Sequence, residues 1–492
     1  MKILTLLTLI FFSLQLMAKP IVVGSKKFTE SVILGEAMRL LLKSQDLEAK
    51  HKAELGGTRI LWNALVSGDI DIYPEYSGTI EEELLKKKTT DLSEIRTALK
   101  KDGIGVSEAL GFNNTYAIGM KRTRAQELGI DSISDLKNFP DLKIGWSSEF
   151  RQRQDGWPGL KATYQLPHKF IRGLDHDVAY RALGQGDIDV IDLYSTDAEI
   201  QYYDILILKD DKDYFPKYEA LFLYRLDKEE VLMPALLALS GTISDEKMSS
   251  LNRQAKIDKK SSTEVAAGLL KEILDAEVTF KVSGRKDRIL LRSLEHFKLV
   301  GVSLLFAILV AIPLGIIVAK SKKFGQLILM IVSAIQTIPA LALLVMMIKP
   351  LSMIGLSGIG DTPAYIALFL YSLLPIVRNT YSGMEQIPMG LQETAAVFNL
   401  SPSTRLLKIE LPLAMPAILT GIKTSLVMNI GFATLGALVG AGGFGQPILT
   451  GIRLDDYGMI LEGAIPAAIL ALLAQKIFDW MERFLISPGL RI

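Results

Sequence analysis

A repeated stretch of sequence constrains the fold of this chain more than any other feature. Residues 68–79 are GDIDIYPEYSGT, and residues 186–197 are GDIDVIDLYSTD. The similarity extends back to Trp62 and Tyr180, so that both copies fit [WY]-x-A-L-x-x-G-D-I-D-[IV]-x-x-x-Y-S. Two copies of one supersecondary unit predict two similar lobes.

Each copy predicts a helix, a glycine cap and a strand that leads to a tyrosine. Apolar residues at helical spacing precede Gly68 and Gly186, and either glycine can adopt the left-handed cap of a helix. The alternation Asp-Ile-Asp-Ile or Asp-Ile-Asp-Val then predicts a strand, with Tyr76 or Tyr194 in a loop at its carboxyl end. Ligands of open α/β sheets bind at this end, so we expect both tyrosines to face one cleft.

Composition excludes several classes of function. The chain has 492 residues, too many for one domain, and 49% of them are hydrophobic, which indicates a part that lies in lipid. A net charge of +1 without a basic tract does not indicate a nucleic-acid partner. The chain has no cysteine, its four histidines lack the spacing of metal ligands, and no nucleophile and base stand out. We therefore expect no cofactor, no metal and no enzymatic activity.

Four regions follow one another along the chain. Residues 1–19 contain an early lysine and an apolar run, which predict a signal peptide or, because the cleavage position is poor, an uncleaved anchor. Residues 20–277 have an α/β pattern, and the repeat positions imply that the chain crosses between the lobes twice, as in a hinge. Residues 278–290 form a polar linker, and residues 291–492 a transmembrane domain.

The transmembrane domain contains five apolar stretches, which predict five spans. These stretches are Phe297 to Ala319, Leu327 to Ile348, Pro363 to Val377, Ala414 to Val439 and Met459 to Phe478. If residues 20–277 are exported, the lysines from Lys320 to Lys323 lie on the cytosolic side, as the positive-inside rule requires. Five spans then place residues 383–412 and the C-terminus in the cytosol.

The cytosolic segment contains a motif. Residues 392–412, QETAAVFNLSPSTRLLKIELP, resemble the E-A-A-x-x-x-G-x9-I-x-L-P loop of ABC importer permeases, which in that family forms a short coupling helix that docks on a separate ATPase. Thr394 replaces an alanine, and Asn399 replaces the glycine while still tolerating left-handed backbone. The matching residues are Glu393, Ala395, Ile409, Leu411 and Pro412. Because the chain has no G-x-x-x-x-G-K-[ST] motif, a separate ATPase is implied.

Residues 20–277 resemble the substrate-binding proteins of betaine, carnitine and choline ABC importers, and residues 278–492 resemble their permease. The matching segments are VGSKKFTE, PEYSGT, LGFNNTY, EFRQRQDG, DLYSTD and FPKYEA. The resemblance implies a bilobed α/β periplasmic-binding-protein fold of type II, fused to an all-α importer domain of five spans. It also implies two sets of ligand contacts: four rings that enclose a trimethylammonium group, Tyr76, Tyr116, Tyr194 and Tyr218, and three residues that hold a carboxylate, Lys26, Thr79 and Arg153.

Physical chemistry supports the assignment of these ligand contacts to the residues of this chain. A quaternary ammonium group has no N–H to donate, so ring faces rather than hydrogen bonds must select it. Two unpaired buried cations, Lys26 and Arg153, would be costly beside choline, which has no carboxylate. We therefore expect a zwitterion such as glycine betaine, carnitine or an ergothioneine-like betaine, with a choline importer as the alternative. For Asp155, capping a turn is favoured over orienting Arg153.

The sequence thus predicts a receptor fused to its permease in a bacterial inner membrane. Five spans are few for a pathway, so two copies should pair above two ATPase subunits, with each receptor held close to its pore by a short linker. The competing hypothesis from another class is a ligand-gated sensor or channel with a similar bilobed receptor, which would function without an ATPase.

Overall fold

The computed structural model describes residues 19–87, 91–169, 171–274 and 284–485. The chain divides into an N-terminal unit, Met1–Val282, and a C-terminal unit, Ser283–Ile492. The expected signal peptide, except Lys19, and residues 278–283 of the expected linker lie outside the described residues.

Two five-stranded sheets form the centre of the N-terminal unit, one in each of two lobes. The first lobe contains the order β2-β1-β3-β10-β4 and the second lobe the order β7-β6-β8-β5-β9. The strands of the first lobe are β1 (Ile21–Gly24), β2 (Ala49–Lys52), β3 (Ile72–Tyr76), β4 (Ile104–Val106) and β10 (Ala220–Arg225). Those of the second lobe are β5 (Tyr116–Lys121), β6 (Ile144–Ser147), β7 (Ile171–Leu174), β8 (Val190–Tyr194) and β9 (Ile205–Ile207).

The two sheets have the same topology, which confirms the two predicted lobes. In the first, β10 is antiparallel to both neighbours, β3 and β4, and in the second β5 is antiparallel to β8 and β9. The chain enters the second lobe between β4 and β5 and returns between β9 and β10, as predicted. The two crossing segments lie side by side: the Asn114 amide donates to the Tyr218 carbonyl at 3.0 Å, and the Ala220 amide to the Phe112 carbonyl at 3.1 Å.

The repeated motif has the predicted caps, but its strands begin and end later in the sequence than predicted. Helices α3 (Thr58–Ser67) and α9 (His176–Gln185) both end at a left-handed glycine, Gly68 with φ 79° and Gly186 with φ 80°. Strands β3 and β8 begin only at the last residue of the predicted alternation. The amides of Asp69 and Asp187 still bond back to the helix, at the carbonyls of Ala64 and Ala182, whereas those of Asp71 and Asp189 donate to the carbonyls of Val22 and Lys143. Tyr76 and Tyr194 are therefore the final residues of their strands and do not lie in loops.

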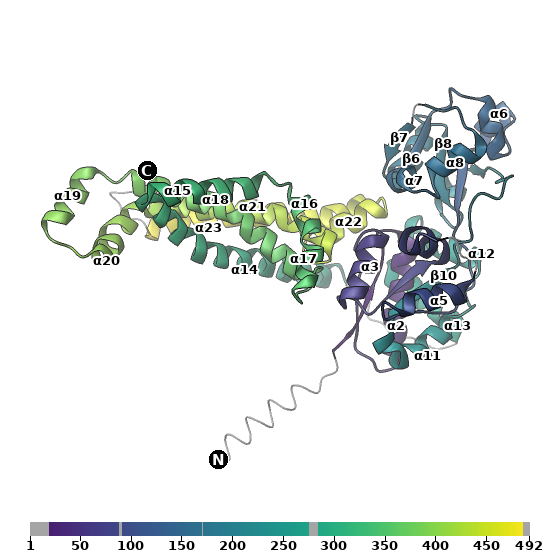
Figure 1. Cartoon of the computed structure of the whole chain (residues 1–492), viewed down its shortest axis with the longest axis horizontal. Helices are drawn as coiled ribbons and strands as arrows, with labels where there is room; N and C mark the ends of the chain where they lie inside the picture. Colours follow the sequence, from purple (N-terminus) through teal and green to yellow (C-terminus); the bar gives the residue numbers. More distant parts are fainter. Residues whose placement is uncertain (1–18, 88–90, 170, 275–283, 486–492) are drawn as a thin grey trace, which may run out of the picture. The chain divides into compact units, whose positions relative to one another are not determined.

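Helices cover both sheets (Figure 1). In the first lobe, α2 packs against β1, β2 and β3 and contacts α11, α12 and α13. The first-lobe helices are α2 (Thr29–Ser44), α3, α4 (Ser77–Thr79), the π-helix η1 (Ile80–Leu85), α5 (Leu92–Lys100), the 3₁₀ helix η3 (Leu226–Lys228), α11 (Glu229–Leu239), α12 (Asp245–Lys256) and α13 (Ser262–Leu274). The second lobe has α6 (Arg122–Leu128), the 3₁₀ helix η2 (Ile133–Asn138), α7 (Ser148–Gln152), α8 (Trp157–Tyr164), α9 and α10 (Glu199–Tyr202).

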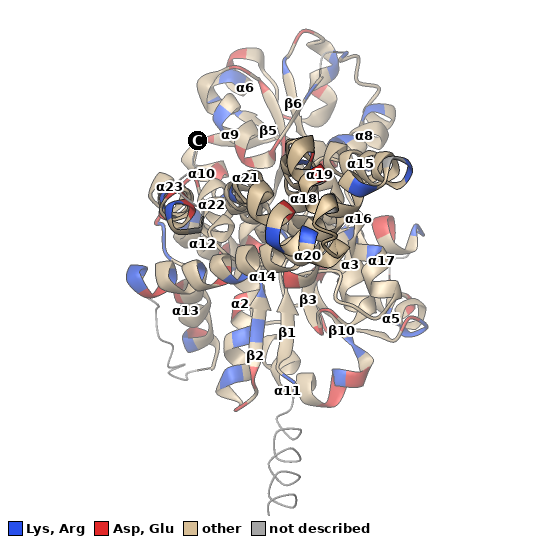
Figure 2. Ribbon diagram, turned by 90° about the vertical axis from the view of Figure 1, so that its left-hand side faces the viewer, with Lys and Arg blue, Asp and Glu red and all other residues tan. Residues whose placement is uncertain are grey.

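The described part of the C-terminal unit consists of helices joined by loops and contains no strand. Helix α18 packs between α14 and α21, which run alongside it (Figure 1). Few charged residues lie on α18 and α21, whose ribbons are mostly tan in Figure 2. The elements are α14 (Arg285–Lys320), α15 (Lys322–Thr337), α16 (Ala340–Met346), α17 (Ile348–Met353), α18 (Asp361–Glu385), α19 (Met389–Val397), α20 (Pro402–Arg405), η4 (Leu406–Glu410), α21 (Leu411–Phe432), η5 (Ala433–Val439), α22 (Gly445–Arg453) and α23 (Tyr457–Leu485).

The predicted count of five spans is not confirmed. Among the described residues, three helices are long and apolar enough to cross a membrane, Arg285–Lys320, Pro402–Val439 and Tyr457–Phe484, and a bent pair would make a fourth. The second expected span is this pair, Lys323–Thr337 and Ala340–Met353, which meet at 94°. Pro339 lies at the break, where it cannot donate an amide hydrogen bond, and the Tyr371 hydroxyl donates to the carbonyl of Ile338.

The third expected span lies in α18, which is not among the helices that meet these limits of length and apolarity. Polar side chains such as Tyr371 and Ser372 interrupt its apolar sequence, and both are buried. A helix covered by α14 and α21 does not need an apolar surface all around it.

The left-handed cap of the repeat can be tested by a pair of glycine substitutions. An added Cβ at Gly186 or at Gly268 would meet no atom within 4 Å, but Gly186 has φ +80° whereas Gly268 lies inside α13. Gly186→Ala should therefore lower the free energy of unfolding by about 1 kcal/mol, and Gly268→Ala should raise it by about 0.5–1 kcal/mol. Thermal unfolding of both variants should show shifts of opposite sign; equal shifts would contradict the assigned cap.

Candidate functional site

Strand pairing brings the predicted tyrosines to the crossing segments. Tyr116, the first residue of β5, is the register partner of Tyr194, the last residue of β8. In the first lobe, Tyr76 at the end of β3 is paired with Ala220 at the start of β10, two residues after Tyr218. In each pair the antiparallel strand, β5 or β10, begins beside the end of its partner, β8 or β3. Each lobe therefore places its rings at the corresponding end of its own sheet.

Five aromatic rings form one continuous cluster, which we call the aromatic box: Phe28, Tyr76, Tyr116, Tyr194 and Tyr218. The centroid of Tyr116 lies 5.0 Å from that of Tyr194 and 5.7 Å from that of Tyr218. Phe28 links Tyr194 to Tyr76, with centroid distances of 5.9 Å and 6.0 Å. The structure thus brings all four predicted tyrosines together. Phe28 was not predicted, although it lies within the matching segment VGSKKFTE.

The tyrosines of the box are buried and neutral. Tyr76, Tyr116 and Tyr218 are each less than 5% exposed, and Tyr194 is partly buried against the core. Burial raises the pKa of all four hydroxyls above the ordinary phenol value. Uncharged phenol rings removed from water present the negative faces that attract a cation.

Lys26 and Arg153 flank the box, one in each lobe. The Lys26 ammonium lies 5.5 Å from the ring centroid of Tyr76, and the Arg153 guanidinium carbon lies 5.5 Å from that of Tyr116. Lys26 forms a buried ion pair with Glu75. Arg153 donates from Nε to Asp155 at 2.8 Å and pairs with the other oxygen of that carboxylate through Nη2.

These ion pairs correct two expectations. From the sequence, Lys26 and Arg153 are expected to be unpaired cations, but in the structure each has a buried carboxylate partner of its own, Glu75 and Asp155. Asp155 was expected to cap a turn; instead it binds Arg153 through both oxygens and accepts a hydrogen bond from the Tyr218 hydroxyl at 2.5 Å. Asp155 therefore orients both the guanidinium and one ring of the box.

Thr79 lies beside the box. It is buried at the end of α4 and follows Gly78, whose backbone is in contact with Tyr218, since an added Cβ would lie 2.7 Å from that ring. Its role in holding a carboxylate stays a prediction.

Two polar neighbours of the box are absent from the predicted site residues, Glu30 and His176. Glu30 is buried and accepts a hydrogen bond from the Tyr76 hydroxyl at 2.5 Å. The ring of His176 lies 4.9 Å from that of Tyr194, and His176 is paired with Asp197 at 2.9 Å. Burial alone would lower the pKa of His176, but the carboxylate of Asp197 raises it to about 9. Glu30 is the last residue of the matching segment VGSKKFTE, which could have marked it, whereas only the long-range fold brings His176 to the rings.

No metal site accompanies the box. Within the described ranges, His, Cys, Asp and Glu form no group of three or more that could hold a metal ion. The box with its flanking ion pairs can bind an organic cation.

The loop with the permease motif forms a second candidate site. Helix α19 contains Glu393, Thr394 and Ala395, and Asn399 adopts the left-handed φ of 50° expected at the glycine position of the motif. Val397 and Phe398, at its end, are 84% and 73% exposed. Ile409 lies in η4, and Leu411 and Pro412 begin α21.

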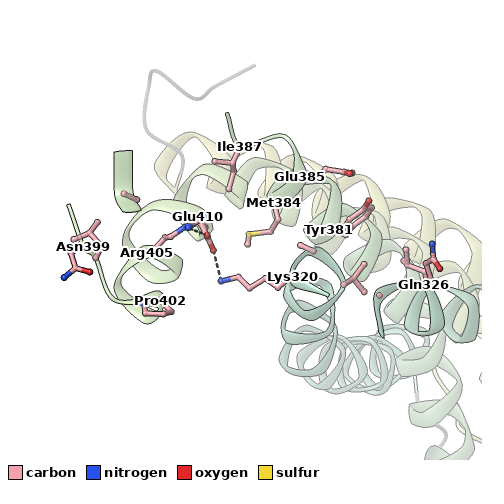
Figure 3. Close-up of a pocket in the computed structure, with 16 residues that line it drawn as sticks. Lys320, Gln326, Tyr381, Met384, Glu385, Ile387, Asn399, Pro402, Arg405 and Glu410 are labelled. Carbon is pink, nitrogen blue, oxygen red and sulfur yellow. Dashed lines mark ion pairs between the residues drawn. The ribbon is translucent and has the colours of Figure 1, made fainter. Parts of the chain in front are cut away.

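A cavity of about 970 Å³ lies between this loop and the ends of α14, α15 and α18 (Figure 3). Glu410 lines it and is almost fully buried. Its carboxylate pairs with Lys320 of α14 at 3.0 Å and with Arg405 of α20 at 2.7 Å. The segment that contains the motif is thereby tied to the first helix of the unit.

Two family models match the two units. Residues 19–272 match the substrate binding domain of ABC-type glycine betaine transport systems, and residues 311–488 match the inner membrane component of binding-protein-dependent transport systems. The first match covers half of the chain.

Curated relatives include two permease proteins and one fused protein that matches over a longer stretch. The choline transport system permease protein OpuBB of Bacillus subtilis is 38% identical over 203 residues, which are 41% of this chain and 91% of that protein. The carnitine transport permease protein OpuCD of Listeria monocytogenes is 39% identical over 191 residues, 39% of this chain and 83% of that protein. The ergothioneine transport permease/ergothioneine binding protein EgtU of Helicobacter pylori is 33% identical over 267 residues, 52% of this chain and 48% of that protein.

The lobed fold, the membrane helices and these matches lead to one conclusion. The chain belongs to the family of ABC-type glycine betaine transport substrate binding domains, fused in one polypeptide to a binding-protein-dependent inner membrane permease.

Proposed function

We propose that the chain captures a quaternary ammonium compound in the aromatic box and passes it through its own permease domain into the cell. The observation that carries the proposal is the contact of four neutral tyrosine rings from both lobes, with Phe28 between them. A trimethylammonium group offers no hydrogen-bond donor, and ring faces are the protein groups that attract it, at about 0.5–2 kcal/mol for each desolvated contact.

The preferred ligand within this class is a zwitterion. Asp155 occupies the Nε and Nη2 edge of Arg153, whereas Nη1 lies 3.8 Å from Glu149, beyond hydrogen-bonding distance. A ligand carboxylate can approach this Nη1 edge, as in glycine betaine, carnitine or an ergothioneine-like betaine. Choline remains the alternative, because the paired state of Lys26 and Arg153 removes the electrostatic argument against it.

Transport also needs an energy source and a pathway. We infer that α19 and its exposed residues Val397 and Phe398 dock on a separate ATPase, in line with the permease match. Exposed apolar side chains along α14 and α23, such as Leu309 and Leu472, fit a lipid surface or a second copy of the chain in a homodimer. In this arrangement the N-terminal unit faces the outside, and residues 383–412 and the C-terminus face the cytosol.

The box itself is tested by ring removal. Tyr76→Ala and Tyr194→Ala each delete one ring face. Calorimetry on the full chain in detergent should therefore show that the affinity for every trimethylammonium ligand falls about tenfold or more. Tyr202→Ala, which removes a ring that is 64% exposed on α10, is the matched control and should bind normally. Unchanged affinity in both box variants would exclude the proposed site.

Arg153→Gln distinguishes the two ligand classes. The variant removes the proposed carboxylate partner and leaves Asp155 without its cation. Affinity for glycine betaine and carnitine should therefore fall about tenfold or more, while affinity for choline should hold or rise. An equal loss for all ligands would show that Arg153 does not contact a carboxylate.

The coupling loop is tested by the double variant Val397→Asp and Phe398→Asp. Two charges on an apolar docking surface should abolish uptake and copurification with the ATPase, while ligand affinity stays at the wild-type value. Ser403→Asp on the same loop is the control, because Ser403 is exposed and polar. Uptake that continues without any ATPase would favour the ligand-gated channel instead.

A further inference from the structure

Glu30 is a buried carboxylate to which four segments of the N-terminal unit converge. It lies in the first turn of α2, and 2% of its surface is exposed. Its Oε1 accepts from the Tyr76 hydroxyl at 2.5 Å and from Asn114 Nδ2 at 2.9 Å. Its Oε2 accepts from the Thr196 hydroxyl at 2.6 Å and from Asn252 Nδ2 at 3.1 Å.

These four donors come from different parts of the hinged fold. Tyr76 ends β3 of the first lobe, Asn114 lies in the first crossing segment, and Asn252 lies in α12. Thr196 belongs to the second lobe, two residues after Tyr194. One carboxylate therefore connects a ring of the first lobe to the segment that follows a ring of the second lobe.

Helix α12 reinforces this connection. Asn252, besides binding Glu30, donates to the Thr196 carbonyl at 3.0 Å. One turn further along, Lys256 pairs with Asp177 at 2.5 Å and with Glu199, both in the second lobe. Glu30 and Asn252 thus both bind Thr196, and Lys256 adds contacts from α12 to α9 and α10 of the second lobe.

We propose that Glu30 is a positioning residue that holds the two halves of the aromatic box in register, by joining Tyr76 of the first lobe to Thr196 of the second. It acts through these donors and does not contact the ligand. The inference deepens the proposed function and rests on it in one respect, because the box is taken to be the ligand site. Charge-assisted hydrogen bonds to a buried carboxylate are the stronger class of such bonds, and a partner left unsatisfied there is costly.

Glu30→Gln preserves the shape of the side chain but removes an acceptor of these hydrogen bonds, because an amide N–H₂ then faces hydroxyl and amide donors. The matched control is Glu36→Gln on the same helix. Glu36 is also buried, but its partners Arg39, His51 and Thr263 all belong to the first lobe. Any general effect of removing a buried carboxylate from α2 should appear in both variants, whereas an effect on lobe register should appear only in Glu30→Gln.

Two measurements on the full chain in detergent separate the outcomes. Because the chain has no cysteine, Lys43→Cys on α2 and Tyr202→Cys on α10 provide two unique sites for spin labels. The interlobe distance between these labels is measured by pulsed electron–electron double resonance. Glycine betaine and choline affinities are measured by calorimetry. Tyr76→Phe and Thr196→Val each remove one hydroxyl donor to Glu30. These two variants serve as the test if Glu30→Gln does not fold.

We expect Glu30→Gln to broaden the interlobe distance distribution and to weaken binding about tenfold or more, mainly through faster dissociation. Tyr76→Phe and Thr196→Val should each weaken binding several-fold and should show no additional loss when combined with Glu30→Gln. A distance distribution and an affinity equal to those of Glu36→Gln would overturn the inference. Wild-type protein that binds none of glycine betaine, carnitine, choline and ergothioneine would refute the proposed function instead, while the distance measurement would still decide whether Glu30 joins the lobes.

Discussion

The antiparallel pairing of β5 with β8, and of β10 with β3, determines where the N-terminal unit can place its aromatic rings. A strand that crosses from one lobe to the other must begin beside the carboxyl end of the strand it joins. Tyr116, at the start of β5, therefore meets Tyr194 at the end of β8, and Tyr218, two residues before β10, meets Tyr116, while Tyr76 at the end of β3 pairs in register with Ala220. The ligand site and the hinge are built from the same few residues, so ligand contacts and lobe movement are expected to be coupled.

Buried charge is balanced locally around these rings. Lys26 is paired with Glu75, Arg153 with Asp155, and His176 with Asp197, each within its own lobe. Paired charges avoid most of the cost of an isolated ion in a dry site. Glu30 differs because its donors are neutral and come from both lobes, which makes it sensitive to their relative position.

The repeat and its glycines allowed much of this fold to be predicted. Left-handed caps at Gly68 and Gly186 follow from local chemistry, and the number of crossings follows from the order of the repeats. The partner of Lys26 could not be predicted, because Glu75 is separated from it by 49 residues and approaches it only through the pairing of β1 with β3. Asp155 lies two residues from Arg153, a separation that permits both a turn cap and an ion pair.

In the membrane part, too, features that depend on contacts between distant residues could not be predicted from the sequence. Hydropathy detects apolar composition, so it found the long helices α14 and α23 but not the 94° break near Pro339. It also does not distinguish a helix that packs among other helices, such as α18, from one that faces lipid. These distinctions depend on packing between segments that are distant in the sequence.

The central claim is that electron-rich rings recognise a fixed positive charge. The most direct test compares glycine betaine with 3,3-dimethylbutanoate, and choline with 3,3-dimethylbutan-1-ol, in calorimetry on the full chain. In each pair a neutral tert-butyl group of nearly the same shape replaces trimethylammonium. The account predicts that both neutral analogues bind about tenfold or more weakly than their charged counterparts. Equal affinity within each pair would show that the box selects shape and apolar surface, and would contradict the account.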